Sequence, residues 1–290
     1  MLHDDWQRYL TEHGTVPDAT GPAGATWLRS LAVMRFRGAD ARSFLQGYLT
    51  SDTTLLDSER LQATAICNLK GRVVANGWCC AAGDTDVRLL VHVSLVARLT
   101  AFLRPYLTFA KTQLEDETPQ LLLIGLLDSA TATPGLELDQ RRQIVPCQDV
   151  DEAAAVWQRA TPAEEASWQT SLVEDRIPLI TEATSEAFLP QMLGLDVSGA
   201  VSFSKGCYLG QEVVARAQHR GEVKRRLRRL LWEDGRDLEP GQEVKDASGR
   251  SVGTIVNAVT VEAHGQCLAV VQSGQDRGLK QGETDLRSAA

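Results

Sequence analysis

The chain has 290 residues, of which 43% are hydrophobic and 23% are charged, and its formal net charge is −8. This length suits about two domains, and the composition is that of an ordinary soluble globular protein. The negative charge argues against a general nucleic-acid binder, although a local basic patch is compatible with it.

The sequence shows neither a targeting segment nor a membrane span. The first residues, MLHDDWQRYL, lack the basic flank and the apolar core of a signal peptide. The strongest apolar run, LLLIGLL at 121–127, is far shorter than the ~20 residues that cross a bilayer. We therefore expect a cytoplasmic protein without membrane association. Because no long apolar surface stripe is evident, we also expect a monomer.

A helix and a strand pair are predicted first. Asp40 has the character of an N-cap, and apolar residues follow at helical spacing over 41–49. The runs LQATAICN (61–68) and RVVANGWCCA (72–81) predict two strands joined by the short turn Leu69-Lys70-Gly71.

The next elements complete an α+β pattern. VRLLVHV (87–93) predicts a third strand, and Ser94 then caps a helix that we expect to end near Pro105. Residues 121–127 predict a buried strand. The order of helix, strands and helix indicates a ferredoxin-like α+β unit.

Two further helices are expected before the motif region. Residues 150–160 predict a short one. Thr161-Pro162-Ala163-Glu164 then has the pattern of a capping box with proline at the first helical position. Trp168 lies on this second helix.

After about residue 226 the pattern changes to short β-rich runs separated by Gly, Asp and Asn turns. This is typical of a small closed or nearly closed β module. We expect the last dozen residues to fray.

The cysteines are scattered, without a C-x-x-C pair or a histidine at zinc-finger spacing: Cys67, Cys79, Cys80, Cys147, Cys207 and Cys267. Such a set indicates reduced thiols, most of them small core residues. Cys79 and Cys80 would point to opposite faces of a strand and could not chelate one ion. No structural metal site is expected.

One cysteine stands in an unusual context, FSKGCYLGQEVVARAQHRG at 203–221. Gly206 and Gly210 bracket Cys207 and allow conformations that other residues resist. Lys205 and a following helix N-terminus would both stabilise a thiolate. A buried, inert cysteine in a tight turn explains the same residues, so both interpretations stay open.

The residues after Gly210 predict an amphipathic helix over 211–218, with Glu212 and Arg216 as an i,i+4 ion pair. Its buried side would comprise Val213, Val214 and Ala217. A nucleophilic Cys207–His219 pair would need a distance that the sequence does not supply.

A dense basic cluster follows, formed by Lys224, Arg225, Arg226, Arg228 and Arg229 and extended by Arg216 and Arg220. It predicts either a solvated strand and helix end or an anion site. The anion would be a polyanionic ligand tail or RNA phosphates.

The motif KGCYLGQE (205–212), continued by VVARAQHRGEVKRRL, resembles the signature of the YgfZ family. These are folate-binding proteins related to the T-protein, the aminomethyltransferase of the glycine cleavage system. Further similar segments are RGADARSFLQGYLTSD (37–52), CNLKGRVVANGW (67–78), IPLITEATSEAFLPQMLGLD (177–196) and ASGRSVGTIVNAV (247–259). The resemblance covers nearly the whole chain after about residue 30.

The resemblance implies a T-protein-like α+β fold with a central folate channel. We expect two interlocked subdomains, including the ferredoxin-like unit, in a folate-binding region at 1–225, and a C-terminal β-barrel at 226–285.

The resemblance also implies that Glu174 holds a pterin, since a carboxylate can accept two N–H groups at once. Trp168 would stack on the flat ring, and Tyr208 and Gln211 are expected to add folate contacts. A solvated helix carboxylate and a core aromatic are the alternatives for Glu174 and Trp168. The ligand would be tetrahydrofolate or a derivative.

One departure from the T-protein pattern bears on activity. By the resemblance, Ala75 and Asn76 stand where a T-protein carries an aspartate pair, one member of which is needed for aminomethyl transfer. Neither side chain can act as a carboxylate base. The resemblance therefore implies folate binding without glycine-cleavage activity.

The family implies a role in the assembly or repair of iron–sulfur clusters in client enzymes, including tRNA-modifying ones. Folate, client proteins and assembly factors would be the partners, with Cys207 as the reactive thiol. Lys205, Gly206, Gly210, Glu212 and Arg216 would support it. The alternatives are a folate-dependent one-carbon transferase with an unknown acceptor and an RNA-binding module. The overall acidity and the lack of interleaved aromatic residues make direct RNA binding the weaker hypothesis.

Overall fold

The computed structural model describes residues 1–13, 24–128, 134–220, 223–275 and 277–289, with the side chains of His219 and Arg220 outside the described set. The chain forms two compact units. Unit 1 comprises Met1–Arg42, Leu55–Gln62 and Trp78–Trp168, and unit 2 comprises Ser43–Thr54, Ala63–Gly77 and Gln169–Ala290. None of the helices in the described ranges is long and apolar enough to span a membrane.

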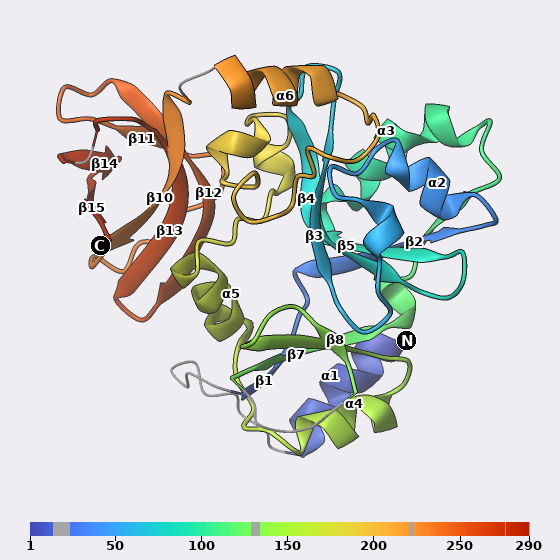
Figure 1. Ribbon diagram of the computed structural model, residues 1–290. Helices are drawn as coiled ribbons and strands as arrows, with labels where there is room; N and C mark the ends of the chain where they lie inside the picture. The colour runs from blue at the N-terminus through green and yellow to red at the C-terminus, as the bar shows by residue number, and fades with distance from the viewer. Residues whose placement is uncertain (14–23, 129–133, 221–222, 276, 290) are drawn as a thin grey trace. The chain divides into compact units, whose positions relative to one another are not determined.

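Unit 1 contains a four-stranded antiparallel sheet (Figure 1). Its strands, in spatial order, are β1 (Gly24–Trp27), β7 (Leu122–Leu127), β9 (Arg142–Cys147) and β8 (Leu136–Glu137). Two helices pack their apolar sides on this sheet, α1 (Leu2–Glu12) and α4 (Val150–Trp157). The prediction of a buried strand at 121–127 is confirmed, since every residue of β7 is buried.

A five-stranded sheet has the order β3-β4-β5-β2-β6. Its strands are β2 (Leu31–Arg37), β3 (Gln62–Cys67), β4 (Val73–Ala81), β5 (Val87–His92) and β6 (Gln113–Asp116). The predicted hairpin and third strand are thus confirmed. The order β6-β2-β5-β4 is that of a ferredoxin-like sheet, and β3 adds a strand at its edge.

The helices of this region differ in detail from the sequence pattern. Helix α2 covers Ala41–Gln46 and ends before Gly47, earlier than predicted. The carboxylate of Asp40 accepts hydrogen bonds from the Lys111 amide (2.8 Å) and from Thr112. Helix α3 covers Val96–Leu107 and continues past Pro105, which was expected near its end.

The described residues also contain five short 3-10 helices. They are η1 (Thr53–Leu55), η2 (Val93–Leu95), η3 (Thr118–Gln120), η4 (Glu182–Thr184) and η5 (Pro190–Met192).

Helix α5 covers Glu165–Glu174, so the predicted start at Thr161 with Pro162 inside the first turn is wrong. Residues 161–163 instead extend along β1. The Ala25 amide donates to the Thr161 carbonyl, and the Ala163 amide donates to the Ala25 carbonyl, both at 2.8 Å. This strand-like pairing uses backbone groups that a helical turn would have needed.

Unit 2 contains the predicted β module, a closed barrel in the order β10-β13-β12-β11-β14-β15 (Figure 1). The strands are β10 (Arg225–Trp232), β11 (Glu243–Lys245), β12 (Ser251–Val261), β13 (His264–Gln272), β14 (Leu279–Gln281) and β15 (Thr284–Ser288). Inward-facing residues such as Leu230, Val252 and Ala269 fill its core. The expected fraying of the last residues is wrong, because β15 pairs with β10 and closes the barrel.

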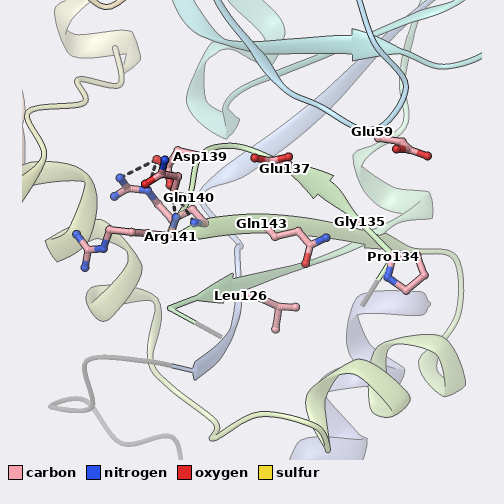
Figure 2. A pocket seen from close by; sticks show the side chains of 10 residues that line it. Glu59, Leu126, Pro134, Gly135, Glu137, Asp139, Gln140, Arg141 and Gln143 are labelled. Atoms are coloured by element: carbon pink, nitrogen blue, oxygen red, sulfur yellow. Dashed lines mark hydrogen bonds and ion pairs between the residues drawn. The ribbon is translucent and has the colours of Figure 1, made fainter. Parts of the chain in front are cut away.

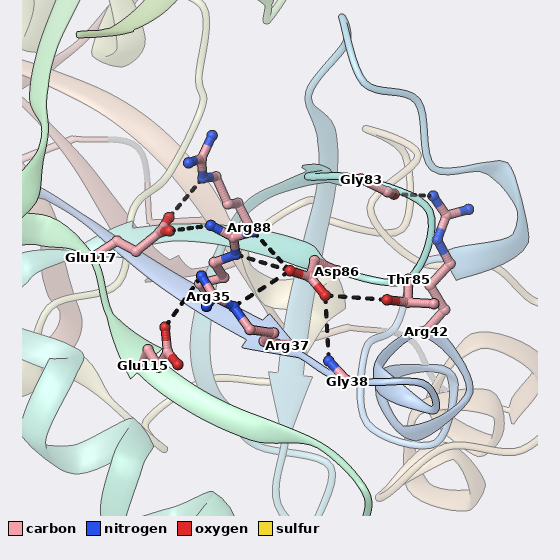
Figure 3. A network of polar contacts seen from close by, with 10 residues as sticks. All are labelled: Arg35, Arg37, Gly38, Arg42, Gly83, Thr85, Asp86, Arg88, Glu115 and Glu117. Atoms are coloured by element: carbon pink, nitrogen blue, oxygen red, sulfur yellow. Dashed lines mark hydrogen bonds and ion pairs between the residues drawn. The ribbon is translucent and has the colours of Figure 1, made fainter. Parts of the chain in front are cut away.

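A charged network joins β2, β5 and the end of β6 (Figure 3). The guanidinium of Arg35 donates to Asp86 and to Glu117, both at 2.7 Å, and Arg88 donates to the other oxygen of Glu117 at 2.7 Å. The Glu117 side chain is only 7% exposed. Burial raises its pKa, but the hydrogen bonds from Arg88 and Arg35 outweigh burial, and the net pKa is lowered.

A carboxyl group whose pKa is lowered on folding stabilises the folded state at pH values above its unfolded pKa. That stability is lost as the pH falls through the folded pKa. We therefore expect Glu117→Gln to lower the free energy of unfolding by about 3 kcal/mol at pH 7, since it leaves two arginines without their shared partner. The difference from the wild type should shrink as the pH falls below about 4.5.

Urea unfolding between pH 7 and pH 3 measures both effects. Glu115→Gln is the matched control, because the Glu115 side chain is 40% exposed and lies 3.6 Å from Arg37. This control should change stability by less than about 1 kcal/mol. A Glu117→Gln effect as small as the control's, or one that grows on acidification, would contradict the role given to the network.

Candidate functional site

Lys205 anchors the motif segment of unit 2. Its side chain is buried, and Nζ donates to the backbone carbonyl oxygens of Gln46 (2.8 Å), Leu49 (2.7 Å) and Ser51 (2.8 Å). An ammonium group has three N–H donors, so these bonds account for all of them. The hydrogen bonds of Nζ therefore go to the backbone of residues 46–51, and the expected influence of its charge on the Cys207 thiol stays a prediction.

Backbone hydrogen bonds tie the same two segments together on either side of Lys205. The Ser202 amide donates to the Thr50 carbonyl (2.9 Å), and the Leu209 amide donates to the Gly47 carbonyl (3.0 Å). The motif at 202–209 is thereby fixed on residues 46–51.

Gly210 brings the motif against the β3–β4 turn. Its φ is +82°, and a Cβ there would collide with the carbonyl oxygen of Asn68. Gly71 in that turn has φ +67° and faces Val213. Gly206 has open space around its Cα and no positive φ. Of the two glycines expected to hold Cys207, only Gly210 is required by the backbone.

Cys207 is the one exposed cysteine of the six, all of which are described. Burial raises the pKa of Cys67 to about 12 and that of Cys80 to about 11. These thiols therefore stay protonated at neutral pH. Within the described ranges, no group of three or more His, Cys, Asp or Glu side chains is placed to hold a metal ion.

Tyr208 and Gln211 stabilise the turn before α6 (Gln211–Arg220). The Gln211 side-chain oxygen accepts from the Tyr208 amide at 3.3 Å. The Tyr208 ring is buried and lies 5.4 Å from Lys205 Nζ. Its hydroxyl has no hydrogen-bond partner among the described residues, and burial raises its pKa. Their folate contacts stay a prediction.

Helix α6 follows the sequence pattern. Glu212 and Arg216 form the predicted ion pair at 2.7 Å, with both side chains exposed. Val214 is buried, while Val213 and Ala217 are half-buried. The position of His219 relative to Cys207 cannot be described, since its side chain lies outside the described residues.

Gln191 is a polar residue that the sequence analysis did not assign. It is 2% exposed, and its Nε2 donates to the Val214 carbonyl at 2.8 Å, which ties η5 to α6. Its Oε1 has no partner in the described part of the chain. The only available signal was its place in the segment AFLPQMLG.

Glu174 ends α5 and faces the barrel. Its carboxylate lies 3.4 Å from the Arg229 guanidinium on β10, and its side chain is 41% exposed. Thr170, one turn earlier on the same helix face, has a buried hydroxyl without a partner among the described residues. A carboxylate and a hydroxyl on one helix face could accept from and donate to the polar edge of a pterin.

Trp168 is a core residue rather than an exposed stacking surface. It is 1% exposed and belongs to unit 1. Its ring packs on the face of β7 where Gly125 leaves room, and a Cβ at Gly125 would come within 2.9 Å of it. This burial agrees with the alternative of a core aromatic, and stacking of Trp168 on folate stays a prediction.

Asn76 and Asn257 hold the segment that follows α5. Asn76 is buried, donates to the Pro178 carbonyl (2.8 Å) and accepts from the Ile180 amide (2.7 Å). Asn257 exchanges two hydrogen bonds with the Leu179 backbone, at 2.7 and 2.9 Å. Asn76 thus has a structural role. The resemblance to T-proteins had implied only that a carboxylate needed for aminomethyl transfer is missing at this position.

A cavity of about 530 Å³ lies beside β8 and β9 in unit 1 (Figure 2). Acidic and basic side chains line it together, including Glu59, Glu137, Asp139 and Arg141. Arg142 is 2% exposed and is neutralised by Asp139 at 2.8 Å. None of the predicted site residues contributes to its lining.

Because five of the six cysteines are buried, we expect only Cys207 to be alkylated in the folded protein. Iodoacetamide should add one carbamidomethyl group per folded chain, at Cys207, because alkylation needs an accessible thiolate. Intact mass and peptide mapping measure this, with Cys207→Ser as the control that should take up no label. Rapid labelling of Cys67 or Cys80 in the folded protein would contradict the burial described.

Comparisons with known proteins agree with the resemblance in the motif. No family model matches the chain. A protein of Haemophilus influenzae described as uncharacterized is 30% identical over 241 residues, which is 81% of this chain and 84% of that protein. The tRNA-modifying protein YgfZ of Edwardsiella ictaluri is 30% identical over 266 residues, 81% of this chain and 80% of that protein. The same-named protein of Cronobacter sakazakii is 28% identical over 279 residues, 86% and 84% of the two chains.

A solved structure supports the fold independently. The glycine cleavage system aminomethyltransferase T from Bartonella henselae aligns with a TM-score of 0.68 at 14% identity, covering 97% of this chain and 87% of that one. The predicted T-protein-like fold is therefore confirmed. With this fold and with these relatives, the chain belongs to the YgfZ family.

Proposed function

We propose that this protein binds tetrahydrofolate or a derivative and supports iron–sulfur cluster assembly or repair in client enzymes, including tRNA-modifying ones. The observation that carries the proposal is the exposure of Cys207, alone among six cysteines, on a segment fixed by Lys205. The name of the YgfZ relatives supports the link to tRNA modification. We propose that the protein acts on tRNA modification indirectly, through its client enzymes. It would do so in the cytoplasm and as a monomer.

The end of α5 supports folate as the ligand. Glu174 is exposed enough to accept from the 2-amino group and N3–H of a pterin, in a pair that a charged acceptor strengthens. Its 3.4 Å contact with Arg229 is long for a charge-assisted bond, so a ligand can compete for the carboxylate. The unpartnered hydroxyl of Thr170 adds a further polar group on that helix face.

The surroundings of Asn76 favour an accessory role over aminomethyl transfer. Its amide is committed to the backbone of Pro178 and Ile180, and an amide cannot act as a general base. A one-carbon transferase would need another base near the folate in place of Asn76. We therefore propose binding without glycine-cleavage turnover.

The thiol of Cys207 contributes a single ligand or redox group. An iron–sulfur cluster usually needs about four thiolates, so Cys207 cannot hold one alone. We propose that its sulfur is shared transiently with a partner protein that supplies the remaining ligands. Lys205 contributes by fixing the backbone around Cys207 rather than by activating the sulfur.

Calorimetry with tetrahydrofolate under anaerobic conditions tests the ligand assignment. Glu174→Ala should weaken binding by about 10- to 100-fold, because it removes a charged acceptor. Cys207→Ser should bind like the wild type. Glu164→Ala is the matched control, since it removes an exposed carboxylate before the other end of α5.

Two results would contradict this proposal. Absence of binding by the wild-type protein would remove folate from its function. Equal affinity of Glu174→Ala and the wild type would show that the pterin is not held at the end of α5.

A further inference from the structure

A group of cations lies at the start of strand β10, and we call it the β10 cationic end: Lys224, directly before the strand, and Arg225 and Arg226 within it. All three side chains are exposed, in a protein of net charge −8. None of them forms an ion pair with a described residue. Four residues further along, Arg229 is paired with Glu174. The strand thus runs from the β10 cationic end to Arg229, which contacts the proposed pterin position at Glu174.

Strand geometry places Arg225 on the same side of β10 as Arg229, whereas Arg226 lies on the other side. Side chains alternate between the two faces of a strand, so Arg229, Leu227 and Arg225 share a face. Consecutive residues rise by ~3.3 Å, which separates the backbones of Arg229 and Arg225 by about 13 Å. Leu227 lies between them and is half-buried. This face therefore carries three groups in order: the Glu174–Arg229 pair, the apolar side chain of Leu227 and the cation of Arg225.

A folate molecule has a matching order of groups. Its pterin is polar, its benzoyl ring is apolar, and its glutamate end is anionic. The two rings and their short bridge span an extended length similar to the Arg229–Arg225 separation. Each additional γ-linked glutamate adds one more carboxylate at the anionic end.

We propose that the β10 cationic end binds the oligo-γ-glutamate tail of a reduced folate whose pterin lies at Glu174. This inference rests on the proposed function and adds a preference for folates with several glutamates. Arg225 supplies a guanidinium group on the face of Arg229 that pairs with a carboxylate, and Arg226 adds positive charge at the same end of the strand. Gln272, directly opposite Arg225 on β13 and also exposed, adds an amide donor.

A folate tail fits this surface better than RNA does. Single-stranded nucleic acids bind where aromatic side chains stack on bases beside the cations. The one aromatic residue of β10, Trp232, is buried in the barrel core. The described part of the strand therefore offers charge without a stacking platform, which suits a flexible chain of carboxylates.

The test compares the monoglutamate and pentaglutamate forms of 5-formyltetrahydrofolate by calorimetry at low ionic strength. The measured quantity is the ratio of their two dissociation constants. In the wild type the pentaglutamate should bind at least about tenfold more tightly, since several exposed charge pairs act together. In Arg225→Gln/Arg226→Gln the ratio should fall to about twofold or less. Added salt should shrink the wild-type ratio.

The control variant removes two positive charges elsewhere on the barrel, with Arg250→Gln and Lys280→Gln. It should keep the wild-type ratio, because these residues pair with Asp246 and Asp285, neither of which lies on β10 or pairs with its cationic end. Tight monoglutamate binding with a ratio near one in the wild type would overturn this inference and leave the proposed function intact. A ratio that falls equally in the control would also overturn it. No binding of either form would refute the proposed function itself.

Discussion

The arrangement of the motif depends on one buried ammonium group. Lys205 Nζ binds three carbonyl oxygens of residues 46–51, at and just beyond the end of α2. A cation at the C-terminal end of a helix satisfies carbonyl groups that have no partner within the helix. Arginine could not replace it easily, because a planar guanidinium does not direct three donors from one nitrogen. With this anchor in place, Gly210 can approach the Asn68 carbonyl, α6 can begin at Gln211, and Cys207 is held in an exposed turn.

The same segment shows what the sequence could and could not predict. Gly210 was identified as a special backbone position, and the α6 ion pair was predicted correctly, because both follow from local rules. The partners of Lys205 lie more than 150 residues away in the chain, so the sequence could not predict that its ammonium group binds residues 46–51. The predicted start of α5 was wrong for a similar reason. Residues 161–163 form backbone hydrogen bonds with Ala25, although their sequence is a good local capping pattern. The packing of Trp168 could not be predicted either, because only the tertiary structure shows the space that Gly125 leaves for its ring.

Asparagine provides a second constraint in unit 2. Asn76 and Asn257, from β4 and β12, bind the backbone of residues 178–180 from two strands. This fixes the chain directly after α5 and therefore the position of Glu174 relative to Arg229 on the barrel. The asparagine hydrogen bonds therefore position the proposed pterin site at Glu174. The proposed site of the glutamate tail is the β10 cationic end. Asn76, which occupies a position where a T-protein carries an aspartate, thus stabilises the backbone after α5.

Hydrogen exchange of Lys205→Met, compared with the wild type, tests the central claim most directly. Methionine keeps the length of the side chain but removes all three donors. The account predicts faster exchange of the Leu209 and Ser202 amides, which bond to residues 47 and 50, and unchanged exchange in barrel strands β12 and β13. Wild-type protection at Leu209 and Ser202 in the variant would show that the motif is held by other contacts, and would contradict the account.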